Sequence, residues 1–308
     1  MKVTLIHNPE AGSEDQPTAE ELVELIHKAG HSVVYQSSKH ADWERVLDQR
    51  PDLVAMAGGD GLVGSVARRL VGKPMPLTIL PLGTANNIAG ALDLKRRPLD
   101  RLIAGWNSAR RLKFDVGVAT GPWGTRYFIE GLGAGAFTET MSRLDARSNV
   151  DLSHHAEADK KIQAALQILR VRMEVSPAIR LKLTLDGRDL TGEYVLLEAM
   201  NICSIGPNLR LAPQADPGDG ALDIVLVADN EREKLQRCLS EQNSGTSAAA
   251  ELTLHRGRQL RIESDEIRVH IDDDVWPNRG EHPPYSPMII DLSLYPERLE
   301  FIVPGEGE

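Results

Sequence analysis

The chain has 308 residues, of which 41% are hydrophobic and 26% are charged, and its formal net charge is −10 at pH 7. These values describe an ordinary globular protein that is long enough for two domains, and the acidic balance argues against nucleic-acid binding. The sequence contains no run of about 18 apolar residues, the length needed to span a membrane. Cys203 and Cys238 lack the paired spacing of a disulfide framework or zinc site. We therefore expect a soluble cytoplasmic protein.

Short apolar strands alternate with helices in the first hundred residues. Strands are predicted at 3–6, 33–35, 53–57 and 77–80. Thr18 and Glu21 form a capping box at the start of one helix, which Gly30 ends, and further helices are predicted at 43–47 and 62–70. This alternation predicts a parallel sheet with helices on both faces, in which ligands bind at the carboxyl ends of the strands.

From about residue 111 the sequence has the pattern of a mainly antiparallel β domain. Strands are predicted at 113–119, 125–129, 179–185, 194–200, 221–227, 260–263 and 267–271. Asp186-Gly187 is a hairpin signal, a helix is predicted around 162–173, and the polar segment 143–157 is predicted to be a loop. The fold class is therefore α/β with two domains: an α/β domain with a parallel sheet over 1–112, and a β-rich, sandwich-like domain over 113–295.

Three loops of small or polar residues follow predicted strands at one edge of the sheet. They are Asn8–Gly12, Gly58–Gly61 and Leu80–Asn87. Glycines let the backbone approach phosphate oxygens closely, and a following helix offers unpaired N–H groups to an anion. A plain strand-to-helix turn is the alternative for each loop taken alone. Three such loops at one edge predict a phosphate-binding site, and it is not a Walker A loop because no Gly-Lys-Ser/Thr follows.

These motifs, in this order, resemble the bacterial diacylglycerol kinase and lipid kinase family over nearly the whole chain. The family's Gly-Gly-Asp-Gly-Thr, Pro-Leu-Gly-Thr-x-Asn-Asp and Arg/Lys-x-Asp-x-Gly motifs resemble Gly58–Leu62, Pro81–Asn87 and Lys113–Gly117. Its Ala-Pro, Asp-Gly-x-Leu-Asp and late Asp-Gly-Glu motifs resemble Ala212–Pro213, Asp219–Asp223 and Asp272–Asp274. The segment 299–304 resembles the last strand of the family, which folds back onto the first domain, so this domain is expected to include 296–308.

The resemblance implies a kinase of lipid metabolism that uses ATP and Mg²⁺ to phosphorylate a lipid hydroxyl such as that of diacylglycerol. The residues it implies for ATP binding are Asn8, Ser37 or Ser38, Gly58, Gly59, Asp60, Gly61, Leu62, Val63, Gly64, Gly83, Thr84 and Asn87. The lipid acceptor is expected in a cleft between the domains, where water is excluded. Transient contact with a membrane surface and a homodimer are further expectations, and no nucleic acid is expected as a partner.

Carboxylates would carry the chemistry that the resemblance implies. Asp274 takes the position of the family's general base, and Asp60 is the second candidate catalytic residue. Asp115 would join Asp60 around the catalytic metal ion. Asp219, together with backbone carbonyls near Asp216 and Ala221, would form a magnesium site that stabilises the β domain. Without the resemblance, Asp219 and Asp223 would be interpreted as turn residues around Gly218 and Gly220. Magnesium neutralises phosphate charge, and a carboxylate positions the attacking hydroxyl.

The chain departs from the family pattern at four of these positions. Leu62 replaces a Thr, Asn87 replaces an Asp, Asp273 replaces a Gly, and Asp274 replaces the longer Glu. These changes keep open the alternative of a weakly active relative that binds nucleotide or lipid for regulation. An NAD kinase, which shares Gly-Gly-Asp-Gly, is a second alternative, and a noncatalytic structural protein is the least favoured.

Overall fold

The structure, a computed structural model, describes residues 1–305 except residue 14 and the segments 146–157, 242–251, 279–280 and 282–285. The chain divides into two compact units. The first comprises Met1–Phe114 and the segment that begins at Glu297, and the second comprises most residues from Asp115 to Pro296. The first unit is built on a mostly parallel sheet and the second is rich in antiparallel strands, so the predicted fold class is confirmed.

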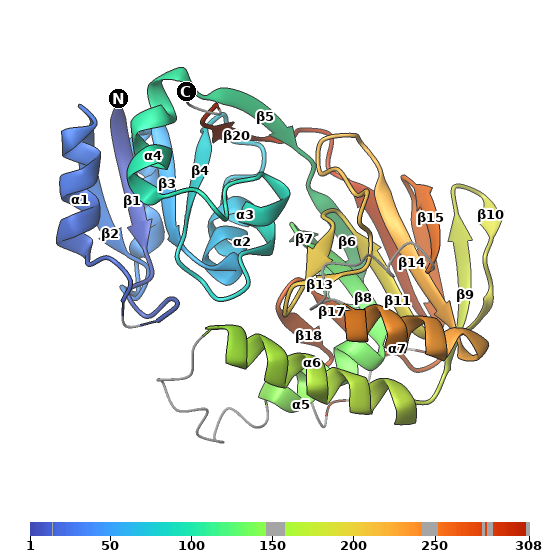
Figure 1. Cartoon of the computed structure of the whole chain (residues 1–308). Coiled ribbons are helices and arrows are strands. Elements are labelled where there is room, and N and C mark those ends of the chain that lie inside the picture. The colour runs from blue at the N-terminus through green and yellow to red at the C-terminus, as the bar shows by residue number, and fades with distance from the viewer. Residues whose placement is uncertain (14, 146–157, 242–251, 279–280, 282–285, 306–308) are drawn as a thin grey trace. The chain divides into compact units, whose positions relative to one another are not determined.

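The first unit contains a six-stranded sheet in the order β2-β1-β3-β4-β20-β5 (Figure 1). Its strands are β1 (Lys2–His7), β2 (Ser32–Ser37), β3 (Leu53–Gly58), β4 (Leu77–Pro81), β5 (Arg110–Phe114) and β20 (Leu299–Val303). The first four strands run parallel, and β20 runs parallel to β4 but antiparallel to β5. The strand near the end of the chain thus lies inside the sheet, where Phe301 packs against Phe114 with ring centroids 5.1 Å apart.

The helices of the first unit form two groups. They are α1 (Ala19–Lys28), α2 (Asp60–Arg69), α3 (Asn87–Ala91) and α4 (Leu99–Ala104), with 3₁₀ helices at Trp43–Gln49 and Gly105–Ser108. Helix α1 contacts α4, and α2 contacts α3. The β1–α1–β2 and β3–α2–β4 connections run in opposite directions across the sheet, so right-handed crossovers place α1 and α2 on opposite faces.

The predicted capping box is confirmed, and the predicted helix at 43–47 needs a correction. The Glu21 N–H donates to Thr18 Oγ1 at 3.2 Å, and the Thr18 N–H donates to Glu21 Oε2 at 2.8 Å. The segment Trp43–Gln49 is a 3₁₀ helix. Its buried apolar residues, Val46 and Leu47, are adjacent, so it lacks the i, i+4 stripe that would stabilise a longer α-helix.

The predicted strand 113–119 is two strands that belong to different units. Lys113 and Phe114 end β5, whereas β6 (Gly117–Gly121) pairs with strands of the second unit. The break lies at Asp115, whose N–H donates to the Pro217 carbonyl at 2.5 Å and whose carboxylate accepts the Gly220 N–H at 2.7 Å. The backbone leaves the ladder because Asp115 is committed to these partners, which a local apolar pattern does not reveal.

The second unit is built from a twelve-stranded, folded sheet. Besides β6, its strands are β7 (Gly124–Phe128), β8 (Gly131–Gly135), β9 (Ile179–Leu185), β10 (Arg188–Asp189), β11 (Gly192–Met200), β14 (Leu222–Ala228), β15 (Thr253–Gly257), β16 (Leu260–Ser264), β17 (Val269–Ile271), β18 (Asp274–Trp276) and β19 (Met288–Leu294). A short hairpin, β12 (Ser204–Ile205) and β13 (Leu209–Arg210), lies apart. Asp186 and Gly187, with φ of 49° and 81°, form the predicted hairpin turn between β9 and β10.

Two apolar cores hold the second unit together. One lies among the strands and includes Leu183, Ile262 and Ile290. The other lies under three helices, α5 (Ala136–Asp145), α6 (Ala158–Val175) and α7 (Arg232–Glu241), which are seen together in Figure 1. The buried face of α6, which includes Leu166, Leu169 and Met173, confirms the predicted helix. Of the predicted loop 143–157, residues 143–145 belong to α5, and the rest lies outside the described residues.

Several elements of the second unit were missed by the sequence analysis, β8 and α5 among them. Strand β8 contains three glycines, which are poor strand formers and hide it from a pattern search. Glycine is required in this strand because of a contact with a neighbouring strand. A Cβ on Gly133 would collide with the carboxylate of Glu198, which lies on the neighbouring strand β11.

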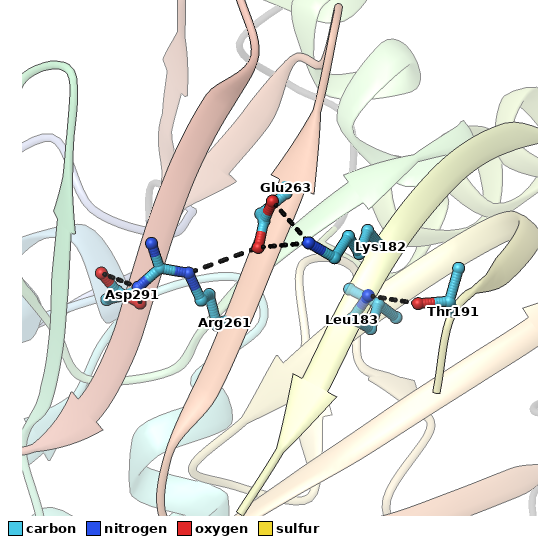
Figure 2. A network of polar contacts seen from close by, with 6 residues as sticks. All are labelled: Lys182, Leu183, Thr191, Arg261, Glu263 and Asp291. Atoms are coloured by element: carbon cyan, nitrogen blue, oxygen red, sulfur yellow. Dashed lines mark hydrogen bonds and ion pairs between the residues drawn. The ribbon is translucent and has the colours of Figure 1, made fainter. Parts of the chain in front are cut away.

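The solvent-facing side of β9, β16 and β19 carries a ladder of alternating charges (Figure 2). Lys182 lies opposite Glu263 in the strand register, with Nζ 3.0 Å from Oε2, and Arg261 lies opposite Asp291, with Nη1 3.1 Å from Oδ1. Exposed pairs of this kind contribute little individually. Their alternation across three strands supports the observed register, because a one-residue slip would turn every side chain to the other face.

In the described part of the chain, no helix is both long and apolar enough to cross a membrane.

Candidate active site

The three predicted loops come together at the carboxyl edge of the parallel sheet. The Asn8 N–H donates to the Ala57 carbonyl at 2.9 Å, and the Leu82 N–H donates to the Gly58 carbonyl at 3.1 Å. A Cβ on Gly59 would lie 3.1 Å from the Gly83 Cα. Two of the loops therefore touch backbone to backbone, which only glycine allows. The third loop joins them through Gly12, whose Cβ position is filled by the Leu82 carbonyl oxygen and whose φ is 77°.

Helix α2 begins within this group of loops and leaves its first N–H groups open. Its N-cap is Gly59, which has no side chain and therefore makes no side-chain capping bond. Within the helix, the first N–H to be used is that of Val63, which donates to the Gly59 carbonyl at 3.1 Å. The N–H groups of the three residues before Val63 have no partner within the helix, and the helix dipole favours an anion at this end. Val63 and Gly64 are buried, so the exposed part of the motif ends with Leu62.

Asp60 joins the first glycine turn to the second. Its carboxylate accepts the N–H of Asn87 at 2.9 Å and that of Ile88 at 3.0 Å, at the start of α3. Burial raises the pKa of Asp60, although the N–H groups of Ile88 and Asn87 and the charge of Lys95 oppose the change. The structure thus gives Asp60 a positioning role between the loops, and its catalytic role stays a prediction.

The turn that contains Thr84 is closed by the side chain of Asn86. Asn86 Oδ1 accepts the Gly83 N–H at 3.0 Å, and Nδ2 donates to the Gly83 carbonyl at 2.6 Å. The backbone of Asn86 is left-handed, with φ of 53°, a conformation that Asn tolerates better than most residues. Asn86 therefore holds the loop in shape, and Thr84 is left half-buried beside it.

The residues around Leu62 and Ser37 lie at the same edge. Leu62 packs over the end of β3, since a Cβ on Gly58 would lie 2.7 Å from its Cδ2. Ser37 ends β2, and its hydroxyl accepts the Lys39 N–H at 3.3 Å. Lys39 forms an ion pair with Glu10 of the first loop. The predicted nucleotide-binding residues of the first unit are thus brought together by the sheet.

The candidate base Asp274 lies in the second unit, at the start of β18. Its side chain is exposed, and it follows a tight turn in which Asp272 has φ of 50°. The Asp272 carboxylate accepts the N–H groups of Ile129, Glu130 and Gly131 at 2.8–3.3 Å. Asp272 therefore fixes the turn, and Asp274 keeps a carboxylate directed to solvent.

A buried acid–base pair, which the sequence analysis missed, supports this turn from below. His270 Nε2 lies 2.8 Å from Glu198 Oε2, and His270 Nδ1 lies 3.0 Å from the Asp272 carbonyl oxygen. Both side chains are buried completely or nearly so. Burial alone would lower the pKa of His270, but Glu198 and the Asp272 carbonyl outweigh it and raise that pKa. The only sequence signal was a charged residue, Glu198, within the apolar run of β11.

In the acidic loop predicted to bind a structural magnesium ion, the carboxylates of Asp216 and Asp219 form hydrogen bonds and an ion pair with protein groups. Asp219 Oδ1 accepts the Ala221 N–H at 3.0 Å, and Asp216 Oδ1 accepts the Gly218 N–H at 2.8 Å. Asp219 also forms an ion pair with Arg256. Among the described residues, no three His, Cys, Asp or Glu side chains are grouped so that they could hold a metal ion. Asp115 and Asp60 lie in different units, and their shared metal site stays a prediction.

Known families match both units of the chain. The model of the diacylglycerol kinase catalytic domain matches residues 2–119, and that of the YegS C-terminal NAD kinase beta sandwich-like domain matches residues 140–303. The chain belongs to the bacterial diacylglycerol kinase and lipid kinase family. It is therefore a kinase, a phosphotransferase with an alcohol acceptor, as the sequence motifs predicted.

Relatives within this family are similar at modest identity. A diacylglycerol kinase of Mycobacterium tuberculosis (strain CDC 1551 / Oshkosh) is 26% identical over 265 residues, which cover 83% of this chain and 78% of that protein. A diacylglycerol kinase of Bacillus subtilis (strain 168) is 27% identical over 243 residues, 73% of each chain. A crystal structure of a diacylglycerol kinase from Bacillus anthracis str. Sterne has a TM-score of 0.68 at 19% identity, covering 98% of this chain and 96% of that chain. This last likeness bears on the fold alone.

Replacing Gly83 by alanine should disrupt the close packing of the Gly59 and Gly83 loops of this kinase. The new Cβ would collide with the Gly59 backbone and with Asn86 Oδ1, and backbone cannot yield as a side chain does. We expect Gly83→Ala to lower the free energy of unfolding by about 1–3 kcal/mol and to weaken nucleotide binding, measured by thermal unfolding with and without ATP. The matched control is Gly90→Ala, whose Cβ would meet only Lys95 Cδ at 3.9 Å. Equal effects of the two changes would contradict the close approach of the loops.

Proposed function

We propose that this chain transfers the γ-phosphate of ATP, in the presence of Mg²⁺, to the hydroxyl of a lipid such as diacylglycerol. The observation that carries the proposal is the open N-terminus of α2 within the three loops, in a chain of the lipid kinase family. An anion is the ligand that this arrangement favours. The relatives named diacylglycerol kinase support the acceptor class.

The phosphate groups would bind to backbone groups of the first unit. The N–H groups of Asp60, Gly61 and Leu62 are the first of α2 and are available to phosphate oxygens. Gly59 and Gly83 hold the two loops close together around these N–H groups, and Thr84 offers a hydroxyl beside them. Asp60 keeps the two loops in register through its bonds to α3, so it would act on the nucleotide through the loop shape.

Magnesium would enter as part of the nucleotide complex. Mg²⁺ keeps several waters and is commonly bound by one or two carboxylates together with substrate phosphates. Asp60 is the carboxylate of the first unit that we assign to it, and the ion would neutralise charge on the transferring phosphate.

Asp274 would accept the proton of the attacking hydroxyl. The Asp274 side chain is exposed. Asp272, two residues earlier, accepts three backbone N–H groups, so the backbone from which the Asp274 side chain extends is held in position. A positioned carboxylate orients the nucleophile in phosphoryl transfer. Aspartate is one methylene shorter than the family's glutamate, and we infer that the acceptor oxygen must come correspondingly closer.

A weakly active, regulatory relative is the second candidate. The observation in its favour is Leu62, which covers the end of β3 with an apolar side chain where the family has a hydroxyl. ATP would still meet the backbone N–H groups, so this candidate predicts binding without turnover. In either case we propose a cytoplasmic protein that meets lipid at a membrane surface, as a monomer or a homodimer.

The deciding experiment is transfer of labelled γ-phosphate from ATP to a mixed lipid extract, with magnesium present or chelated. A labelled lipid that forms only with magnesium supports the proposal and identifies the acceptor. ATP binding without a labelled lipid favours the regulatory relative. Labelled NADP formed from added NAD would instead assign the chain to NAD kinase activity.

A further inference from the structure

The acidic loop before β14 has an arginine placed over it by the neighbouring strand. Asp223 on β14 lies opposite Arg256 on β15 in the antiparallel register. From this position the guanidinium reaches the loop and forms an ion pair through Nη2 with Asp219 Oδ2. Both residues are partly open to solvent, with side-chain exposures of 53% for Arg256 and 24% for Asp219. The loop thus already has a cation beside its central carboxylate.

Three of the oxygen atoms expected to hold the ion, both carboxylate oxygens of Asp219 and the Asp216 carbonyl, are engaged by protein groups. Asp219 Oδ2 pairs with Arg256, and Oδ1 accepts the Ala221 N–H at 3.0 Å. The Asp216 carbonyl accepts the Asp219 N–H at 3.3 Å. Mg²⁺ demands near-octahedral geometry and short oxygen distances, so binding would require Asp219 to give up Arg256 and the loop to reopen. The residues of the loop do not fit a resident magnesium ion.

The loop is also held in place from its inner side without an ion. Asp115 is 2% exposed, and its carboxylate accepts the Gly220 N–H at 2.7 Å. Its own N–H donates to the Pro217 carbonyl at 2.5 Å. These two bonds fasten both ends of the turn to the start of the β-rich unit. A bound ion would hold the loop in shape by drawing its oxygen atoms together. Here Asp115 and Arg256 together stabilise that shape.

The charges near Arg256 fit this role. Asp219 raises the pKa of Arg256 most, first by its hydrogen bond and then by its charge, and Asp223 and Asp216 add to the effect. Burial raises the pKa of Asp223, and Arg256 opposes that change. The Asp219 carboxylate contacts the guanidinium, and Asp223 lies opposite Arg256 in the strand register, so two acidic residues lie beside this one cation.

We propose that Arg256 is a built-in cation that replaces the structural magnesium ion expected for this loop, so that the β-rich unit folds without a divalent ion. The proposal concerns Arg256, Asp219 and their neighbours in one unit. It stands independently of the proposed activity, because it predicts a property of the nucleotide-free protein.

The test compares wild type, Arg256→Met and Arg258→Met as full chains without nucleotide, each melted with EDTA or with magnesium chloride. Arg258 is the matched control because it is exposed, lies two residues further along, and loses the same charge. We expect the wild type and Arg258→Met to have the same Tm in EDTA and in magnesium. Arg256→Met should melt about 2–4 °C lower in EDTA and recover part of this loss with magnesium, because an ion that binds only the folded state stabilises it.

Two results would overturn the proposal. One is a wild-type Tm that rises with magnesium as much as that of Arg256→Met, since the loop would then bind the ion with the arginine present. The other is an Arg256→Met Tm equal to that of the wild type in both solutions. Calorimetric titration of magnesium into the nucleotide-free proteins gives a second readout: one site is expected in Arg256→Met, and that site is expected to be absent from the wild type.

Discussion

Asp274→Asn should lower the rate of phosphate transfer by about 10²–10⁴-fold, the range that a positioned general base contributes. The amide keeps the size of the side chain but cannot accept the hydroxyl proton. The side chain is exposed at the start of β18, so the loss should occur without a change in folding. The measurement is the initial rate of label transfer to the identified acceptor, together with the Tm of the variant.

The neighbouring carboxylate provides the control for this prediction. Asp273→Asn removes the same charge from an adjacent exposed position and should change the rate only a few-fold. Asp274→Glu restores the longer side chain of the family and should keep or raise the rate. If Asp274→Asn retains the wild-type rate in an active preparation, Asp274 is not the base, and the carboxylate must be sought elsewhere.

His270→Ala should destabilise the β-rich unit by about 3–5 kcal/mol, because it leaves Glu198 buried without its partner. The pair is completely or almost completely buried, and its 2.8 Å contact joins β17 to β11 through the space left by Gly133. The measurement is denaturant unfolding of the full chain. The comparison is the double variant Glu198→Met with His270→Leu, in which no charge is left buried; it should be more stable than His270→Ala. A His270→Ala protein within about 1 kcal/mol of the wild type would show that the pair is not a structural element.

The same pair should make stability depend on pH. The pKa of His270 is raised above its ordinary value of 6.5, so the folded state binds this proton more tightly than the unfolded state. Its contribution is then fully present below pH 6.5 and is lost as the pH rises through the folded pKa. The free energy of unfolding of the wild type should decrease over that interval. The double variant should lack this part of the decrease, and an unchanged slope would exclude the pair as its source.

The local features of the fold were largely predictable because they depend on residues close together in the sequence. The Thr18–Glu21 capping box, the apolar face of α6 and the hairpin turn at Asp186 are all formed within a few residues, the range over which periodicity and turn chemistry act. The meeting of three loops at one edge also followed from sequence, because parallel strands place their carboxyl ends together. The order of the motifs then led to the kinase family, which the comparisons confirmed.

Tertiary structure decided which polar groups serve each other, because their partners are distant in the chain. Glu198 and His270 are 72 residues apart, and Asp115 and the Gly220 N–H are 105 apart. Asp272 is the first of three carboxylates in a row, and the sequence does not reveal that it accepts N–H groups more than 140 residues away while the Asp274 side chain stays exposed. Arg256 gave no signal at all. A sequence states which charges a chain carries, but only the pairing of strands brings opposite charges together, as β14 and β15 do for Arg256 and the acidic loop.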